Sequence, residues 1–291
     1  MDSFFKAGER GSSVGQEVRA GLTTFLAMAY IIAVNPSLLT QAGIPAAAAV
    51  TATCLGAGVM TILMGLIANR PLACASGMGV NAVFAFTLTG IAGGDWHAAS
   101  AVIFIEGVAI LILVLCGLRE AIMDAIPVSL RHAISVGLGL FIAMIGLADA
   151  GIIVADESTM VALGDVFSPT FLVGLISIIV TIVLYAMNVK GALLLGIILA
   201  VLAGIPLGVT QMPSGIVSGL DFSTFGAPFQ ADEAGIMGIA KVVTNPTLLI
   251  FAFSLMMSDF FDTMGTAMAV AKQGEFLEAD GRVKDIKPIL I

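Results

Sequence analysis

Long apolar segments recur along the whole chain, and they constrain its fold more than any other feature of the sequence. Hydrophobic residues make up 59% of the 291 residues, and charged residues only 11%. A soluble domain has roughly 25% charged residues. A helix needs about 20 mostly apolar residues to cross a bilayer core that is roughly 30 Å thick. The sequence therefore predicts an all-α polytopic membrane protein.

Eight segments are long and apolar enough to be membrane spans. They cover residues 21–39, 46–68, 72–91, 98–118, 128–147, 170–187, 192–209 and 245–271. We expect Asn35-Pro36 to interrupt the first span near its end, because a proline removes a backbone donor. The longest connection, residues 210–243, contains Gly, Pro and polar residues, and it is expected to be an extracytoplasmic loop with a surface helix around 232–241.

The basic residues predict the orientation of the spans. With a cytoplasmic N-terminus, all of the 12 Lys and Arg residues except Lys241 fall on the cytoplasmic side, as the positive-inside rule requires. Residues 1–20 then form a cytoplasmic N-terminal segment, without the pattern of a signal peptide, and residues 272–291 a cytoplasmic loop. We expect a multi-pass protein of the cell membrane whose surroundings are the lipid bilayer. Nucleic acid is not an expected partner, because the basic residues are scattered singly.

The last span carries two carboxylates near its middle, Asp259 and Asp262, in the sequence NPTLLIFAFSLMMSDFFDTMGTAMAVA. An Asp at the centre of a membrane helix costs about 2.5–3.5 kcal/mol on insertion scales. A spacing of three places both on one helix face, which must point at protein or water. Acids at this depth are functional by default; the alternative is a buried pair held by internal hydrogen bonds.

The third span is the second unusual element, because Gly77 and Gly79 lie near its midpoint beside Ser76 and Asn81. Glycine pairs weaken helices, and a broken backbone at membrane depth is tolerated only where it lines an enclosed cavity. Discontinuous helices mark midplane binding sites in transporters. We expect a half-helix that starts near Asn81. The alternative is close helix packing through small residues.

Two further polar residues leave alternatives open, and hydrolytic motifs are missing. Glu106 in the fourth span either is a structural partner of a neighbouring hydroxyl or backbone group or has a role in transport. Asn35 either satisfies backbone groups freed by Pro36 or faces substrate. The sequence contains no zinc-protease motif and no nucleophile elbow, so we expect neither an enzyme nor a cofactor other than protons as the coupling ion.

Four segments together resemble the nucleobase–cation symporter-2 superfamily, and within it the AzgA-like branch of purine permeases. They are GLTTFLAMAYIIAVNPSLL at 21–39, ANRPLACASGMGVNAVFAFT at 68–87, IPVSLRHAISVGLGLFIAMIGLADAGII at 126–153 and SDFFDTMGTAMAVAKQG at 258–274. The second is similar to the branch pattern Ala-Pro-Gly-Met-Gly-Leu-Asn, and the fourth to Asp-x-Phe-Asp-Thr-x-Gly-Thr. These two are the specific matches.

The resemblance implies a fourteen-helix fold of two inverted repeats of seven, with a core domain and a gate domain. Residues 21–118 and 244–271 would be core helices one to four and eight, and residues 119–209 gate helices five to seven. A short extended strand in the third helix would fall near residues 74–80. The implied substrate-binding residues are Asn35, Gly77, Met78, Gly79, Asn81, Asp259 and Thr263, and the implied proton-coupling residues are Asp259 and Asp262.

The implied function is import of purine nucleobases (hypoxanthine, guanine, adenine or xanthine) by proton symport, with a homodimer as one option. Two carboxylates one turn apart in a low dielectric cannot both ionise cheaply, so we expect the pair to share a proton. Two departures matter: Ser76 stands where the family pattern has Pro, and the chain stops at Ile291 after the eighth helix. We therefore expect a fragment of a longer protein or a truncated gene product. The alternatives are an anion transporter of the same fold and a non-transporting fragment that needs a partner chain.

Overall fold

The computed structural model describes Phe5 and residues 12–117, 128–189, 191–210, 219–231 and 235–273. Of the predicted N-terminal segment 1–20, Phe5 and residues 12–20 are described, and its last seven residues already belong to the helix Val14–Met28. The predicted cytoplasmic loop 272–291 lies outside the described residues except for its first two. Contacts divide the chain into two compact units, one of residues 1–32, 71–73 and 140–219, and the other of residues 33–70, 74–139 and 220–291. The assignment of spans to core and gate domains stays a prediction.

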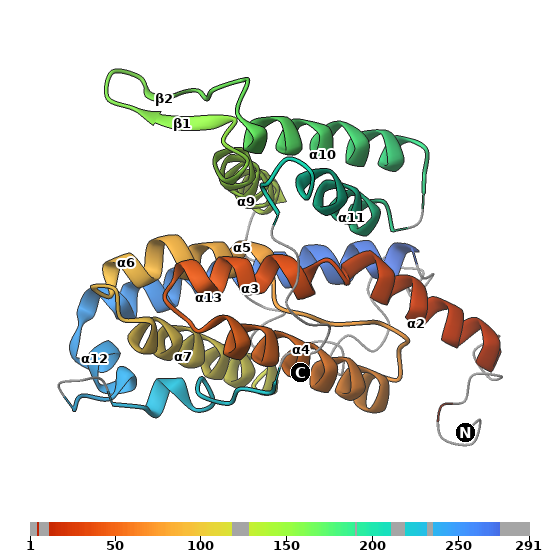
Figure 1. The fold of residues 1–291 in the computed structure, drawn as a ribbon. Coiled ribbons are helices and arrows are strands. Elements are labelled where there is room, and N and C mark those ends of the chain that lie inside the picture. The colour runs from red at the N-terminus through yellow and green to blue at the C-terminus, as the bar shows by residue number, and fades with distance from the viewer. Residues whose placement is uncertain are drawn as a thin grey trace. The chain divides into compact units, whose positions relative to one another are not determined.

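The structure is mostly helical, as expected for an all-α polytopic protein (Figure 1). Within the described residues, Val14–Gln41, Ala46–Ala68, Trp96–Leu115 and Pro169–Ala186 are long and apolar enough to cross a membrane. A further candidate span consists of α12 (Gly238–Thr244) and the first part of α13 (Pro246–Gln273), which meet at an angle of 98°. Shorter apolar helices cover the other three predicted spans: Met78–Ile91, Gly139–Asp149 and Ala192–Gly204.

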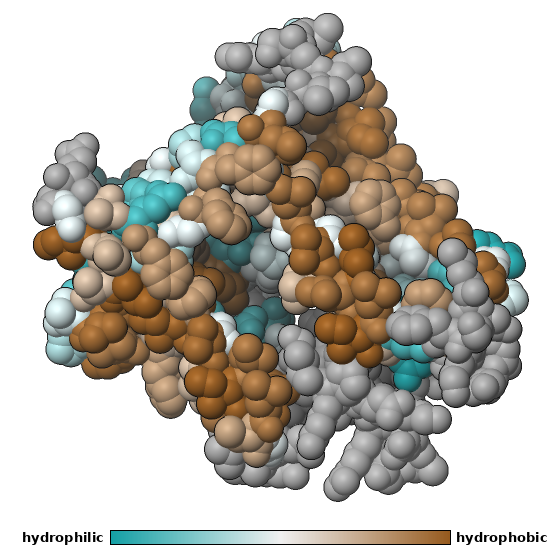
Figure 2. Space-filling view, turned by 90° about the horizontal axis from the view of Figure 1, so that it is seen from below, coloured by the Kyte–Doolittle hydropathy of each residue, from teal (hydrophilic) through white to brown (hydrophobic). Residues whose placement is uncertain are grey.

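Large apolar side chains point outward along these helices. Ile62, Leu115, Ile179 and Phe253 are each more than half exposed, as expected where lipid rather than water surrounds the protein. Figure 2 shows this character on one face of the molecule, where hydrophobic side chains cover most of the coloured surface. The outward apolar surface and the helix lengths together agree with a membrane-spanning fold.

In the first unit, α10 (Pro169–Ala186) and α11 (Ala192–Gly204) lie side by side, and α11 also packs on α2 (Val14–Met28) (Figure 1). Gly196 allows the first of these contacts, because a Cβ at this position would collide with the Thr181 hydroxyl. Ser168 caps α10 by accepting a hydrogen bond from the Phe171 amide at 3.2 Å. Small residues thus bring these helices close together, as is common in membranes.

The second unit is arranged around α7 (Trp96–Leu115), which packs against α13, α12 and the short helix η4 (Ala227–Phe229). It also contains α4 (Ala46–Leu63), which continues as the π-helix η2 (Met64–Ala68). The third predicted span consists of α5 (Met78–Ala82), the π-helix η3 (Val83–Leu88) and α6 (Thr89–Ile91). The described part of α9 (Val128–Asp149) falls in both units.

The first predicted span breaks earlier than expected. The helix ends at Met28, the chain turns at residues 29–30, and α3 (Ile31–Gln41) continues with Pro36 inside it. The expected interruption at Asn35-Pro36 is therefore wrong. A proline removes one backbone donor, and here α3 continues through this position without ending.

A β-hairpin was not predicted. Strands β1 (Ile153–Asp156) and β2 (Met160–Leu163) pair antiparallel between α9 and α10. The Asp156 carboxylate accepts hydrogen bonds from the amides of Ser158 and Thr159, both at 2.8 Å, and these bonds lower the pKa of Asp156. The apolar residues on either side of Asp-Glu-Ser-Thr were the available sequence signal.

Candidate functional site

The third predicted span is broken, and its first part is not helical. Residues 69–77 adopt neither helix nor strand, and Asn69 begins this extended segment in the left-handed conformation, with φ at 53°. The Thr61 hydroxyl holds Cys74 from α4: it accepts from the Cys74 amide at 2.9 Å and lies 3.3 Å from the Cys74 carbonyl oxygen. Side-chain hydroxyls thus satisfy backbone groups that a continuous helix would have paired internally.

The helix after this segment begins at Met78, three residues before the expected start at Asn81. Gly77 is the N-cap residue, with an extended backbone, and its carbonyl oxygen accepts from the Asn81 amide at 3.1 Å. Met78 and Gly79 therefore lie in the first turn, and Gly79 is buried. The Asn81 side chain points back along the helix and donates to the Ser76 hydroxyl at 2.9 Å. No strand is assigned to the described residues 74–80: residues 74–77 are non-helical, and residues 78–80 already belong to α5.

Asp262 of α13 lies directly beside Gly77. A Cβ at this glycine would lie 3.3 Å from Asp262 Oδ2, which is a tight contact. The break in the third span and the acidic helix therefore meet at this point. Thr263 is the next residue and is partly buried. The structure brings together one of the two predicted acids and the predicted glycine segment.

Asn35 on α3 and Thr53 on α4 form a buried polar pair. Thr53 Oγ1 donates to the Ala49 carbonyl oxygen at 2.7 Å, so it can only accept from Asn35, whose Nδ2 lies 2.8 Å away. This fixes the Asn35 amide with its NH₂ group toward Thr53. Asn35 is 4% exposed, and among the described residues no donor reaches its Oδ1. A buried unpaired acceptor costs about 1–3 kcal/mol.

A cavity of about 460 Å³ lies between the Asn35–Thr53 pair and Asn81 of the third span. We name it the amide cavity because the carboxamides of Asn35 and Asn81 line it. Its lining residues come from α3, α4 and the broken third span: Asn35, Leu39, Ala52, Thr53, Gly56, Ala57, Met60, Cys74, Ala75, Ser76 and Asn81. Carboxamides and hydroxyls supply both donors and acceptors on an otherwise apolar wall. Such a wall suits a small neutral ligand with polar edges.

The charge of Asp259 interacts with that of Glu106, which extends from α7 and is 4% exposed. The described lining of the amide cavity includes neither Asp259 nor Asp262. Glu106 is the residue whose role the sequence left undecided, and its signal was one carboxylate within the apolar stretch IFIEGVAIL. The structure thus adds a buried acid from a second helix.

The N-terminal end of α7 is fixed by a polar cluster. Asp95 accepts from the Lys241 ammonium at 2.6 Å and from the His97 amide at 2.9 Å. Partial burial alone would raise the pKa of Asp95, but the bond from Lys241, the amides of His97 and Ala98 and the Lys241 charge outweigh it and lower the pKa. The His97 ring stacks on Trp96 with centroids 3.8 Å apart. A Cβ at Gly238 would lie 2.5 Å from the His97 carbonyl oxygen, so α12 approaches α7 at backbone distance.

Apolar membrane-length helices, a broken third span and a cavity with two carboxamides in its wall define a polytopic membrane protein with the plan of a transporter. Comparison with known proteins gives the same class. Residues 15–280 match the sequence model of the Permease family (Xan_ur_permease), and the chain belongs to this family. This family membership confirms the prediction that the chain is part of a permease and not of an enzyme.

Individual relatives match along nearly the whole chain. The guanine/hypoxanthine permease PbuG of Bacillus subtilis is 38% identical and matches 96% of this chain, and the guanine/hypoxanthine permease PbuO of the same species is 35% identical and matches 99%. The adenine permease AdeP of Escherichia coli is 36% identical and matches 100% of the chain. The matched regions are 63–66% of the length of these curated relatives, so the chain spans less than two thirds of them.

Proposed function

We propose that this chain is the substrate-binding part of a secondary transporter that imports purine nucleobases together with protons. The observation that carries the proposal is the amide cavity, in which Asn35 and Asn81 face a common space beside the break in the third span. A neutral purine has N–H donors and ring-nitrogen acceptors on its edges, and a carboxamide complements both. The printed names of the relatives, guanine/hypoxanthine and adenine permeases, support the same ligand class.

The proton would reside on the carboxylates of α7 and α13, of which Glu106 is buried and Asp259 and Asp262 are half-buried. Glu106 and Asp259 come from two packed helices and their charges interact. Two nearby carboxylates in a low dielectric hold one proton more readily than two negative charges. Asp262 lies against Gly77, which precedes the first turn of the helix that carries Asn81. Protonation at these acids and ligand binding at the amide cavity would then favour the same conformation, which is how binding couples two ligands.

Uptake by cells tests the proposal. Cells of a strain without purine permeases, expressing the full-length protein, are given radiolabelled hypoxanthine, guanine, adenine or xanthine. We expect accumulation of at least one base, which a protonophore abolishes and sulfate does not reduce. Competition by sulfate would favour the anion-transporter alternative. Absence of uptake for all four bases, with the protein present in the membrane, would refute the proposal.

A further inference from the structure

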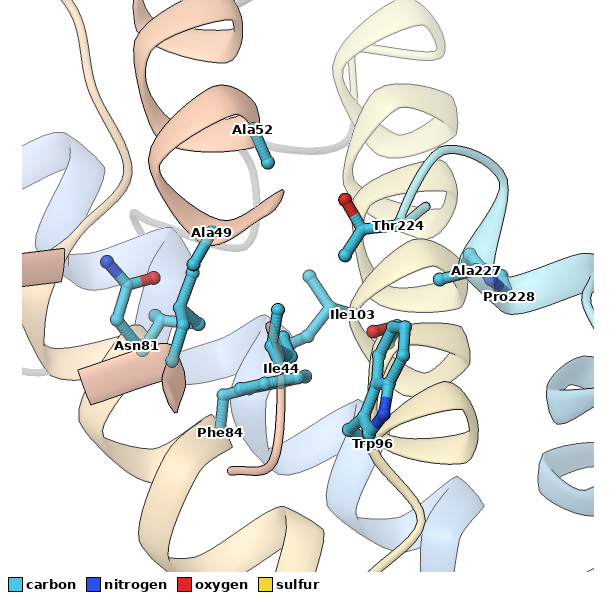
Figure 3. A pocket seen from close by; sticks show the side chains of 13 residues that line it. Ile44, Ala49, Ala52, Asn81, Phe84, Trp96, Ile103, Thr224, Ala227 and Pro228 are labelled. Carbon is cyan, nitrogen blue, oxygen red and sulfur yellow. The ribbon is translucent and has the colours of Figure 1, made fainter. Parts of the chain in front are cut away.

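A second cavity adjoins the amide cavity. It has a volume of about 280 Å³ and is lined by the end of α3, the start of α4, the third span, α7 and the loop 219–231 (Figure 3). We name it the tryptophan cavity, after Trp96. Leu39, Ala52 and Asn81 line both cavities. The two spaces therefore meet at Asn81, whose carboxamide is available to a ligand in either one.

An aromatic side chain in a fixed position forms part of the wall. Trp96 is the first residue of α7, where Asp95 and Lys241 hold the helix end and His97 stacks on the indole ring. Phe84 and Ile103 add apolar surface to the same wall (Figure 3). Aromatic rings bind planar heterocycles by stacking at little cost in conformational entropy when they are already held in place.

Few polar groups face this cavity, and they come from three elements. Ser100 lies one turn after Trp96 on α7, Thr224 belongs to the loop, and Asn81 lies on the third span. Small-molecule sites combine an apolar wall with a few placed polar groups, in volumes of roughly 300–1,000 Å³ for drug-sized ligands. A cavity of about 280 Å³ suits a ligand the size of a bicyclic base.

The loop that forms one wall of the cavity is anchored to the helices on both sides. The Asp221 amide donates to the Thr51 hydroxyl of α4 at 3.1 Å. Phe229 contacts Phe104 of α7 edge to face, with ring centroids 5.1 Å apart. These contacts hold Thr224, Ala227 and Pro228 in the wall. The cavity is therefore formed before any ligand enters it.

We propose that the tryptophan cavity is a second binding site for a planar heterocyclic base, next to the amide cavity and separate from it. The proposal rests on the proposed function, and it adds a site that the sequence analysis did not assign. With the orientation predicted from Lys and Arg, α7 begins on the outer side. An imported base would then stack on Trp96 first and pass Asn81 into the amide cavity.

Trp96 makes the proposal directly measurable, because it is the only tryptophan of the 291-residue chain. Its fluorescence is recorded while the purified full-length protein is titrated with hypoxanthine, and Trp96→Phe gives the background. Binding of radiolabelled hypoxanthine is measured on the same samples. Ser100→Phe and, on a separate element, Thr224→Leu fill the tryptophan cavity. Gly56→Leu fills the amide cavity, and a Cβ at Gly56 meets no atom within 4 Å.

We expect saturable quenching of Trp96 in the wild type, loss of quenching in Ser100→Phe and Thr224→Leu, and quenching retained in Gly56→Leu. The double variant Trp96→Leu with Gly56→Leu is expected to bind hypoxanthine about tenfold more weakly than Gly56→Leu alone, because one base–aromatic stack is lost. Val108→Phe, at an exposed position of α7 outside both cavities, is the matched control and should behave as the wild type does.

The outcomes separate this proposal from the proposed function. Wild-type protein that binds labelled hypoxanthine without any change in Trp96 fluorescence would overturn the second site alone. Quenching that disappears in Gly56→Leu and survives in both Ser100→Phe and Thr224→Leu would also overturn the second site, because Trp96 would then report a ligand bound in the amide cavity. If the wild type does not bind labelled hypoxanthine, the result would count against both proposals.

Discussion

Replacing Thr53 with valine tests the polar pair that lines the amide cavity. Valine keeps the shape of threonine and removes the oxygen that accepts from Asn35 Nδ2 at 2.8 Å. Asn35 is 4% exposed and its Oδ1 already lacks a partner among the described residues. The substitution would leave the whole amide unpaired in the interior. Each newly unsatisfied buried donor costs about 1–3 kcal/mol, so we expect unfolding to become easier by that amount.

The assay is equilibrium unfolding of the purified protein in mixtures of a mild and a denaturing detergent. Unfolding is followed by the fluorescence of Trp96. Thr53→Ser retains the accepting oxygen and is the matched control, with a smaller effect expected. The double variant Thr53→Val with Asn35→Leu removes both partners and is expected to recover most of the stability, since apolar replacement of a whole polar pair is close to neutral. A Thr53→Val protein as stable as Thr53→Ser would refute this account of the pair.

Other substitutions have equally definite outcomes. Gly238→Ala puts a Cβ 2.5 Å from a backbone oxygen of α7, so we expect a loss of about 1–3 kcal/mol in the same unfolding assay, whereas Gly107→Ala, where a Cβ meets nothing within 4 Å, should be neutral or stabilising. The pKa of Asp95 is lowered in the folded protein, so its stabilising contribution is complete above its unfolded pKa of about 4 and is lost as the pH falls through its folded pKa. The stability of Asp95→Asn should lack this acid dependence. A variant with the same pH profile of stability as the wild type would count against this role of Asp95. Asp259→Asn and Asp262→Asn should each uncouple hypoxanthine uptake from protons or abolish it, because the proposal places the proton on these acids. Normal proton-driven uptake by both variants would defeat the roles given to these acids.

The sequence predicted helix positions best where composition alone decides them. The second span was expected at 46–68, and helices α4 and η2 cover Ala46–Ala68. Asn245-Pro246 marked the start of the last span, and α13 begins at Pro246, because proline is favoured in the first turn of a helix and disfavoured in its interior. Long apolar runs and proline act locally, so they can be recognised without the rest of the fold.

Features that depend on contacts between distant residues could not be predicted in this way. The first span turns at residues 29–30 rather than at Pro36, and the sequence there carries no helix-breaking residue. The sequence left two roles open for Asn35, a partner of freed backbone groups or a residue that faces substrate, and it gave no sign that Nδ2 donates to Thr53, 18 residues away. At Asn35 the partner is a residue of another helix, which local preference does not reveal.

The candidate site was predicted in its parts and not in its arrangement. The glycine break and Asp262 do meet, since Asp262 lies beside Gly77. The spacing of Asp259 and Asp262 suggested one pair on one helix face, and the structure adds Glu106 of α7, whose charge interacts with that of Asp259. Helical periodicity relates residues within one helix, but it does not say which acid of another helix stands opposite. The functional roles of these residues remain predictions.

Binding of radiolabelled hypoxanthine, guanine and adenine to purified protein tests the central claim, that a purine occupies the amide cavity. The wild type is compared with Gly56→Leu, which fills this cavity, and with Gly58→Leu, which adds the same side chain on the same helix outside the lining; a Cβ meets nothing within 4 Å at either glycine. The account predicts saturable binding of at least one base to the wild type and to Gly58→Leu, with a large loss of affinity in Gly56→Leu. Equal binding by all three proteins, or no binding by the wild type, would contradict it.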